Sequence, residues 1–269
     1  MTTSSDDPTS VARPNGGADH PASTTDGAKT AVVTGASSGI GEAVARTLAA
    51  AGYHVVVGAR RVDRITELAT EIGGTGRQLD ITDDESVARF VDGLGHVDVL
   101  VNNAGGAKGL DPVATADLDD WRWMWETNVL GTLRITKALL PALEASGDGL
   151  IVTITSTAAL EVYDNGSGYT SAKHAEGVLH RTLRFELLGK PIRLTEICPG
   201  MVETDFSLVR FGGDKERADA VYSGMTPLRA DDIAEVVGFV ASRPPHVDLD
   251  QIIIRPRDQA SSRRNVKTG

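Results

Sequence analysis

Three side chains in the middle of the chain have the types and spacing needed to move a proton to or from a carbonyl oxygen. They are Ser156, Tyr169 and Lys173, within the stretch LIVTITSTAALEVYDNGSGYTSAKH (150–174). Tyr169 and Lys173 are four positions apart, so at the start of a helix both side chains lie on one face. A free phenol is a poor base at neutral pH because its pKa is about 10. A neighbouring ammonium stabilises the phenolate and is expected to lower that pKa.

The hydroxyl of Ser156 completes this chemistry. It closes a predicted buried strand thirteen residues before Tyr169 (169 − 156), and it can hold a substrate oxygen while the proton moves. A Tyr-x-x-x-Lys pair alone is a weak pattern that a chain of 269 residues can contain by chance. The spacing to Ser156 and a nucleotide-binding motif nearer the N-terminus favour the catalytic interpretation.

The elements that position these groups are expected to alternate between strands and helices. From Lys29 onward, strand-like runs alternate with helical ones, which predicts an α/β fold with a parallel sheet. The predicted strands cover residues 30–34, 54–58, 77–80, 97–101, 150–156, 192–197 and 251–255.

A glycine-rich turn, GASSGIG, follows the first predicted strand and leads into an amphipathic helix that ends near Ala51. Gly35 permits the tight turn, Gly39 lets the backbone approach a phosphate, and Gly41 lets helix and strand pack closely. The helix N-terminus then presents free N–H groups and a partial positive charge to a pyrophosphate. The spacing GxxxGxG differs from GxGxxG, and such a turn can be purely structural. Its position between strand and helix favours nucleotide binding.

The end of the second strand predicts which dinucleotide binds. Folds that prefer NAD place an acidic residue there to bind the ribose 2′-hydroxyl. Here that place holds Ala59, followed by Arg60 and Arg61. Because arginine binds phosphate through charge-assisted hydrogen bonds, we predict NADP(H), with Arg60 as the main contact of the 2′-phosphate. Arg61 is expected to stack beside the adenine, or else to be a solvated residue in the first turn of the next helix.

The ends of the third and fourth strands are also expected to border the cofactor. Asp80 can accept a hydrogen bond from the adenine amine. The segment Asn102-Asn103-Ala104-Gly105 combines small residues with amides, which suits close passage of a ligand at the carboxyl end of a strand. The asparagines can equally be turn formers.

The substrate side is less defined by the sequence. Residues 201–225 are expected to be helical but irregular, and a mobile segment there would act as a lid. Three tryptophans at alternate positions, Trp121, Trp123 and Trp125, cannot all lie on one helical face. We expect core or interface positions before substrate contacts. A long helix over 128–145 is apolar on more than one face, which suggests a contact between subunits.

Composition excludes several classes of protein. The chain of 269 residues is 41% hydrophobic and 24% charged, which is ordinary for one globular domain with a sizeable core. A net charge of −10 argues against nucleic acid or an anionic membrane as a partner. We expect no transmembrane helix and no secretory signal. Apart from His174 and His180, which are six positions apart, the six histidines lack the spacing of metal ligands, so a metal site is not expected.

The two ends of the chain differ from its middle. Residues 1–28 are rich in Ser, Thr, Pro, Gly and Asp, which predicts a disordered tail that is either a solvated leader or a docking segment. Residues 256–269 are predicted to be a basic C-terminal tail. The single Cys198 follows an apolar strand pattern, so we expect a buried, inert thiol, and a reducing cytoplasm fits.

Taken together, these motifs resemble the short-chain dehydrogenase/reductase family over about residues 29–255. The residues that carry the resemblance appear in order and at family spacing: Thr34-Gly35-Ala-Ser-Ser-Gly39-Ile-Gly41, Asp80, Asn102-Asn103-Ala104-Gly105, Asn128, Ser156, Tyr169-x-x-x-Lys173 and Pro199-Gly200-Met-Val202-Glu-Thr204. The joint pattern is far more specific than any single motif. The resemblance implies a single-domain Rossmann fold, with a doubly wound, parallel seven-stranded sheet flanked by helices.

The resemblance also implies roles for individual residues. Tyr169 would be the acid–base, Lys173 would lower its pKa and hold the nicotinamide ribose, and Ser156 would position the carbonyl. Asn128 would anchor a water in the proton relay. The predicted cofactor contacts are Gly35, Ser37, Ser38, Gly39, Ile40, Gly41, Arg60, Arg61, Asp80, Ile81, Asn102, Ala104, Gly105, Tyr169, Lys173, Pro199, Gly200, Val202 and Thr204.

Within the family, the segment from Thr204 to Phe211 and the ending IIIRPRDQ resemble NADP-dependent 3-hydroxy acid (serine-type) dehydrogenases. The ending is also similar to that of clavulanic acid dehydrogenase. Arg210 is predicted to bind a substrate carboxylate, or else to be a surface residue of the lid. The family resemblance implies a homo-oligomer, a dimer or tetramer, formed through helices at 128–145 and 168–189.

The sequence therefore predicts a cytoplasmic NADP(H)-dependent oxidoreductase. It would transfer hydride between the nicotinamide and a carbonyl or secondary alcohol, best a 3-hydroxy acid or a related small polar alcohol. One alternative is a ketoreductase of bulkier substrates, such as a secondary metabolite or a steroid. Another is a non-catalytic NADP sensor, because a fold does not fix a function. The complete Ser–Tyr–Lys–Asn set argues against a sensor.

Overall fold

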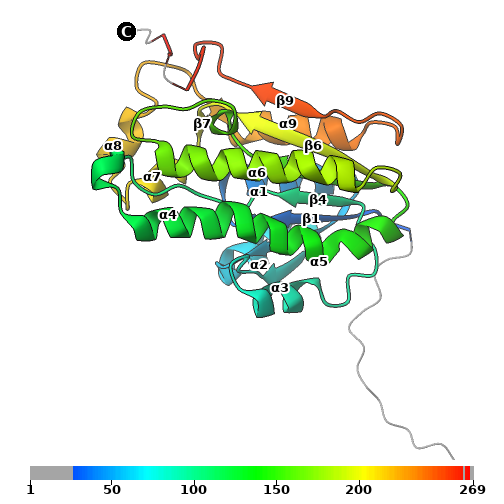
Figure 1. Ribbon diagram of the computed structural model, residues 1–269. Helices are drawn as coiled ribbons and strands as arrows, with labels where there is room; N and C mark the ends of the chain where they lie inside the picture. The colour runs from blue at the N-terminus through cyan, green and yellow to red at the C-terminus, as the bar shows by residue number, and fades with distance from the viewer. Residues whose placement is uncertain (1–26, 263, 267–269) are drawn as a thin grey trace, which may run out of the picture.

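Apolar, largely β-branched runs form the strands of one central sheet, because they are buried on both faces. Figure 1 shows the computed structural model, which describes residues 27–262 and 264–266. Within these residues, seven parallel strands lie in the order β3-β2-β1-β4-β5-β6-β9. The strands are β1 (Thr30–Thr34), β2 (His54–Ala59), β3 (Thr75–Gln78), β4 (Val99–Asn102), β5 (Gly149–Ile154), β6 (Ile192–Pro199) and β9 (Gln251–Ile254). The predicted single-domain, doubly wound sheet is confirmed.

Helices cover both faces of this sheet. On one face, α1 (Gly39–Ala50), α2 (Val62–Ile72) and α9 (Ala230–Ala241) bury Leu48, Ile65 and Ile233 in one hydrophobic cluster. On the other face, α3 (Asp84–Val91), α5 (Thr132–Ala145) and α6 (Ser167–Glu186) contribute to a second cluster that includes Phe90 and Leu139. The helix α4 (Leu118–Trp125) continues through a π-helical turn, η2 (Glu126–Gly131), into α5. In Figure 1, α4, α5 and α6 run across the near face.

Two strand predictions were shifted along the sequence. The third strand, predicted at 77–80, lies at Thr75–Gln78, and Asp80 N bonds the Ser86 hydroxyl instead of a strand neighbour. The fourth, predicted at 97–101, lies at Val99–Asn102, because Val97 N donates to Ala142 O. In both cases a residue of a helix, Ser86 of α3 or Ala142 of α5, accepts the hydrogen bond of a backbone N–H that the strand ladder would otherwise use.

The segment after β6 is irregular, as predicted. A short strand, β7 (Val202–Glu203), pairs with β8 (Leu228–Arg229), and two short helices lie between them, α7 (Phe206–Arg210) and α8 (Lys215–Ala220). Figure 1 shows α7 and α8 at the side to which the arrowheads of β4 and β6 point. The segment therefore lies at the carboxyl ends of the parallel strands, where ligands of such sheets bind.

Of the two predicted tails, the structure describes mainly the C-terminal one. Residues 1–26 of the predicted N-terminal tail lie outside the described residues. The described part of 256–269 packs against the domain. Gln259 is 6% exposed and accepts a hydrogen bond from Met201 N at 2.9 Å, while Ser262 N donates to Glu161 at 2.7 Å. Across the part of the chain that the structure describes, no helix is long and apolar enough to cross a membrane.

Candidate active site

One large cleft runs along the carboxyl ends of the strands. Strand order reverses between β1 and β4, which is the switch point where dinucleotides bind in open α/β sheets. The cleft has a volume of about 1150 Å³ and extends from Arg60 and Arg61 past the glycine-rich turn to Ser156 and Tyr169. It is continuous, so a long ligand held at the arginines reaches the predicted catalytic groups.

The three predicted catalytic side chains meet in this cleft. Ser156 lies between β5 and the 3-10 turn η3 (Thr157–Ala159), and its Oγ accepts a hydrogen bond from Ala158 N at 3.0 Å. That bond uses an acceptor lone pair, so the hydroxyl hydrogen can be donated to the Tyr169 oxygen or to a substrate oxygen. Tyr169 and Lys173 lie on α6 and line the cleft while being only 7% and 4% exposed.

The charge of Lys173 lowers the pKa of Tyr169, as predicted, but the net pKa of the phenol lies above its ordinary value. Burial raises the pKa of the phenol, and this effect exceeds the lowering by the Lys173 charge and by the Ser156 hydrogen bond. Glu176 also raises it. Spacing along a helix showed the cation but not the extent of burial. The phenol is therefore held in its protonated form, which suits a proton donor.

Lys173 is paired with an acid that the sequence analysis missed. Its Nζ donates to Glu176 Oε2 at 2.6 Å and to Ile154 O at 3.3 Å. Glu176 is 1% exposed and also accepts a hydrogen bond from Thr132 Oγ1 at 3.1 Å. The three-residue spacing from Lys173 was the signal in the sequence that could have found it.

Asn128 is fully buried in the π-helical turn η2, a deviation that often occurs at functional sites. Its Nδ2 donates to Met124 O at 2.7 Å and to Gly106 O at 2.9 Å, and its Oδ1 accepts from Gly106 N at 3.1 Å. A Cβ on Gly105 would lie 2.7 Å from that Oδ1. The side chain thus holds the loop after β4, and its predicted role as a water anchor stays a prediction.

The glycine-rich turn makes the cradle that a pyrophosphate needs. Gly35 and Gly39 have φ of +66° and +59°, and a Cβ at Gly35 would lie 2.8 Å from the Cα of Ala104. Gly41 packs against Gly35 and against the amide of Asn103, so a side chain there has no room. The N-terminus of the twelve-residue helix α1 opens at this cradle. These features fit a bound dinucleotide.

The two arginines after β2 take different positions. Arg61 donates to Ser37 Oγ at 2.9 and 3.1 Å and to Ser38 Oγ at 2.7 Å, so it bonds the glycine-rich turn, and its stacking beside the adenine stays a prediction. Arg60 is exposed, lines the cleft, and its charge reaches Asp80. Although burial raises the pKa of Asp80, hydrogen bonds from Thr82 and the charge of Arg60 bring it below its ordinary value. Asp80 thus stays an acceptor.

Most of the predicted cofactor residues line the cleft. They are Gly35, Ser37, Ser38, Gly39, Ile40, Arg60, Arg61, Asp80, Ile81, Ala104, Gly105, Tyr169, Lys173, Pro199, Gly200, Val202 and Thr204. Asn102 is an exception. Its Nδ2 donates to Oγ1 of Thr136 on α5 at 2.8 Å, and the residue is 3% exposed. Side chains alternate along a strand, so its neighbour Asn103 faces the cleft instead.

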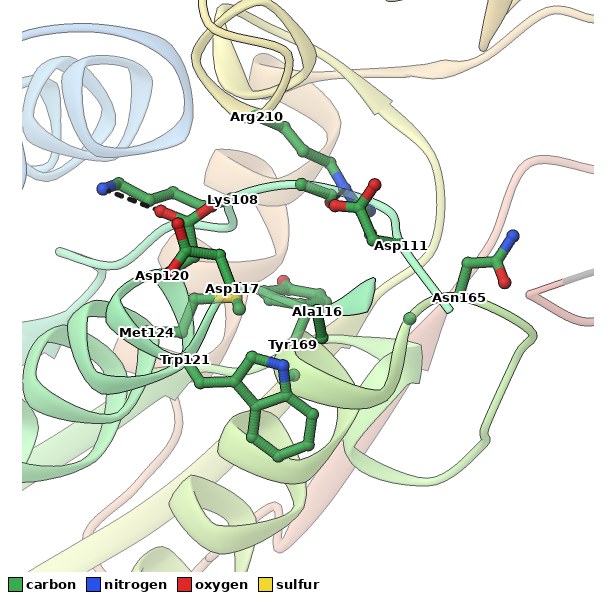
Figure 2. A pocket seen from close by; sticks show the side chains of 13 residues that line it. Lys108, Asp111, Ala116, Asp117, Asp120, Trp121, Met124, Asn165, Tyr169 and Arg210 are labelled. Atoms are coloured by element: carbon green, nitrogen blue, oxygen red, sulfur yellow. Dashed lines mark hydrogen bonds and ion pairs between the residues drawn. The ribbon is translucent and has the colours of Figure 1, made fainter. Parts of the chain in front are cut away.

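Arg210 lies at the substrate end of the cleft. Its Nε donates to Gly109 O at 2.9 Å and its Nη1 to the Tyr163 hydroxyl at 3.2 Å, and its guanidinium carbon is 5.7 Å from the ring centres of Tyr163 and Tyr169. A side pocket of about 20 Å³, room for about one water, adjoins it. Figure 2 shows Arg210, Asp111 and Tyr169 around this side pocket. The sequence analysis missed Tyr163.

Two further predictions concern apolar residues near the site. Trp123 lines the cleft and Trp121 borders the side pocket, and both pack on the cluster that contains Tyr169. Trp125 is 41% exposed.

Cys198 is fully buried, and burial raises the pKa of its thiol to about 12, so it is not a nucleophile at neutral pH.

Comparisons with known proteins identify the family of the chain. Residues 29–211 match the short chain dehydrogenase family. An uncharacterized oxidoreductase of Mycobacterium tuberculosis is 72% identical over 88% of this chain and 94% of its own. A serine 3-dehydrogenase of Agrobacterium fabrum is 40% identical over 86% of this chain and 95% of its own. The solved closed form of a serine dehydrogenase complexed with NADP+ aligns with a TM-score of 0.84 and 34% identity, over 88% of this chain and 98% of that one. The chain is therefore an oxidoreductase of the short-chain dehydrogenase/reductase family.

Proposed function

We propose that this protein is an NADP(H)-dependent oxidoreductase that interconverts a carbonyl and a secondary alcohol, with a small 3-hydroxy acid as the best substrate. The observation that carries the proposal is the meeting, in one cleft, of the glycine cradle, two arginines and the buried Ser156–Tyr169–Lys173 group. A protein that only sensed the cofactor would have no use for a buried phenol and ammonium beside it.

In the reducing direction, the net reaction consumes a carbonyl, NADPH and one proton, and forms the alcohol and NADP+. When bound, NADPH supplies the hydride that adds to the carbonyl carbon. Ser156 donates a hydrogen bond to the carbonyl oxygen. Tyr169 breaks its O–H bond and gives the proton to the same oxygen as negative charge develops there. The Lys173 ammonium stabilises the phenolate that remains, which regains a proton from solvent.

The choice of NADP(H) rests on the end of β2. The position that would hold a carboxylate for a free ribose hydroxyl is Ala59, and the next two residues are cations. Arg61 is already oriented by Ser37 and Ser38, so less conformational freedom is lost when it meets a phosphate. The relative solved with NADP+ supports the same cofactor.

The substrate class rests on Arg210. Its guanidinium is fixed 5.7 Å from the Tyr169 ring by bonds to Gly109 and Tyr163, so a carboxylate bound to it lies next to the proton donor. The relative named serine 3-dehydrogenase has a substrate with a carboxylate, which supports this reading.

The proposal is tested by NADPH oxidation at 340 nm with 3-oxo acids and with neutral ketones of matched size. We expect turnover of the acids, and we expect Arg210→Met to raise their KM about tenfold or more, the loss of a charge-assisted hydrogen bond. The KM of a neutral ketone should change little. Turnover of bulky neutral ketones alone would favour the ketoreductase alternative, and NADPH binding without any turnover would favour a sensor.

We also propose that the protein acts in the cytoplasm as a dimer or tetramer. Large apolar side chains are exposed on α5 and α6, including Leu133 (39%), Val178 (56%) and Phe185 (80%). Helix faces with this much apolar exposure are typical of contacts between subunits. Light scattering should give a multiple of the mass of 28.3 kDa, and a monomer would contradict the proposal.

A further inference from the structure

A buried ion pair lies directly beneath the proposed proton donor. The Nζ of Lys173 and the Oε2 of Glu176 are 2.6 Å apart, and the two side chains are 5% and 1% exposed. Both residues lie on α6, one turn apart. From α5, the Thr132 hydroxyl donates to the other oxygen of Glu176 at 3.1 Å, so both carboxylate oxygens have a hydrogen-bond donor. This contact set fixes the carboxylate in one place.

A buried ammonium needs a counter-charge. Removing one partner of a buried ion pair leaves an uncompensated charge, which destabilises the protein or causes the group to lose its proton. Burial lowers the pKa of Lys173, but Glu176, together with Tyr169 and Cys198, raises it, and the net pKa lies above its ordinary value. Burial likewise raises the pKa of Glu176, whereas the charge of Lys173 and the hydrogen bonds from Lys173 and Thr132 lower it. The carboxylate therefore offsets the cost of burying the ammonium.

The other titratable groups around the pair do not provide this charge. Tyr169 faces Lys173 from α6 and Cys198 faces it from β6, and both are neutral because burial raises their pKa values. The charge of Glu196, on β6, raises the pKa of Glu176. The Glu196 carboxylate accepts its own hydrogen bonds from Thr155, Arg181 and Gln251. Among these groups, Glu176 is the acid bonded to the ammonium.

We propose that Glu176 is a positioning residue, whose carboxylate is the counter-ion that keeps the Lys173 ammonium charged and held below Tyr169. This inference rests on the proposed function, in which a charged Lys173 stabilises the Tyr169 phenolate. The ion pair therefore affects how the rate of reduction depends on pH.

The direction of that consequence follows from the charges. Reduction needs a charged Lys173 and a protonated Tyr169. Without the Glu176 carboxylate, the pKa of Lys173 falls, so the ammonium loses its proton at lower pH. Glu176 also raises the pKa of Tyr169, so its removal lets the phenol ionise at lower pH. Both effects move the alkaline limit of the reduction rate to lower pH, whereas a merely structural role would leave it in place.

The experiment is the pH profile of kcat for NADPH-dependent reduction in the wild-type protein and in Glu176→Gln, Glu176→Asp and Glu196→Gln. We expect the alkaline limb of Glu176→Gln to move down by about one pH unit or more, the effect of one close opposite charge. Glu176→Asp keeps the charge and should keep the limb near its wild-type position. Glu196→Gln removes an equally buried carboxylate and should not move the limb downward.

The outcomes separate this inference from the proposed function. A wild-type protein without turnover would overturn the proposed function, whereas active wild type with an unmoved limb in Glu176→Gln would overturn only the role of Glu176. The same shift in Glu196→Gln or in Glu176→Asp would also overturn it. If Glu176→Gln does not fold, Thr132→Val removes one hydrogen bond from the carboxylate. A smaller downward shift is then expected, and no shift would overturn the inference.

Discussion

Replacing Arg61 by alanine should reduce the preference for NADPH over NADH, to which Arg60 also contributes. The guanidinium lies at the end of β2, where three hydrogen bonds to Ser37 and Ser38 hold it against the glycine-rich turn. An arginine so placed needs little reorganisation to bind a phosphate. A hydrogen bond to a charged group contributes about 1.5–3 kcal/mol, and about 1.4 kcal/mol corresponds to a factor of ten in affinity. We therefore expect Arg61→Ala to weaken NADPH binding roughly 10- to 100-fold.

The assay is fluorescence titration of the protein with NADPH and, separately, with NADH. Loss of the bonds to Ser37 and Ser38 disturbs the turn for both cofactors, so the NADH titration measures this shared effect and the ratio of the two affinities reports the 2′-phosphate. Arg60→Ala should also lower the ratio. Arg64→Ala is the control, because Arg64 is exposed on α2 and does not line the cleft. Equal losses for NADPH and NADH in both cleft variants would refute the reasoning about the 2′-phosphate.

Two other predictions concern packing and stability. Gly41→Ala places a Cβ 2.6 Å from Gly35 O, so we expect a loss of about 1–3 kcal/mol in unfolding free energy and weaker NADPH binding. Gly95→Ala is the control, because a Cβ there has no neighbour within 4 Å, and it should change neither quantity. Equal effects in urea denaturation would contradict this. Burial lowers the pKa of His180 to about 4. The neutral His180 imidazole therefore contributes fully to the unfolding free energy above pH 6.5, and this contribution is lost as pH falls through 4. The wild-type unfolding free energy should fall by about 3 kcal/mol more than that of His180→Gln between pH 7 and pH 4. Parallel pH dependences would contradict the assignment.

Residue types and order were enough to predict the architecture. The prediction used apolar runs, the glycine-rich turn before α1 and the spacing of Tyr169 and Lys173. The structures that these features predict depend on contacts within one element or between consecutive elements. The positions of these features in the structure follow the prediction, apart from shifts of about two residues where Asp80 N and Val97 N bond helices instead of strands.

The properties that the sequence did not predict depend on contacts between distant segments. Asn102 bonds Thr136 of α5, because side chains alternate along a strand and a strand that ends one residue later than predicted changes which side chain faces the cleft. Gln259 packs on the turn after β6, although its neighbours in sequence are polar and typical of a tail. The raised pKa of Tyr169 depends on the burial of its ring, which spacing does not reveal.

The central claim is that Tyr169 donates the proton, and Tyr169→Phe tests it most directly. Single-turnover reduction of a 3-oxo acid should be followed at 340 nm with enzyme saturated with NADPH. The variant keeps the ring, so NADPH affinity should stay within about twofold of wild type, while the rate of hydride transfer should fall by at least about 100-fold, the contribution of a positioned general acid. A variant that binds NADPH normally and reduces the substrate at the wild-type rate would contradict the claim.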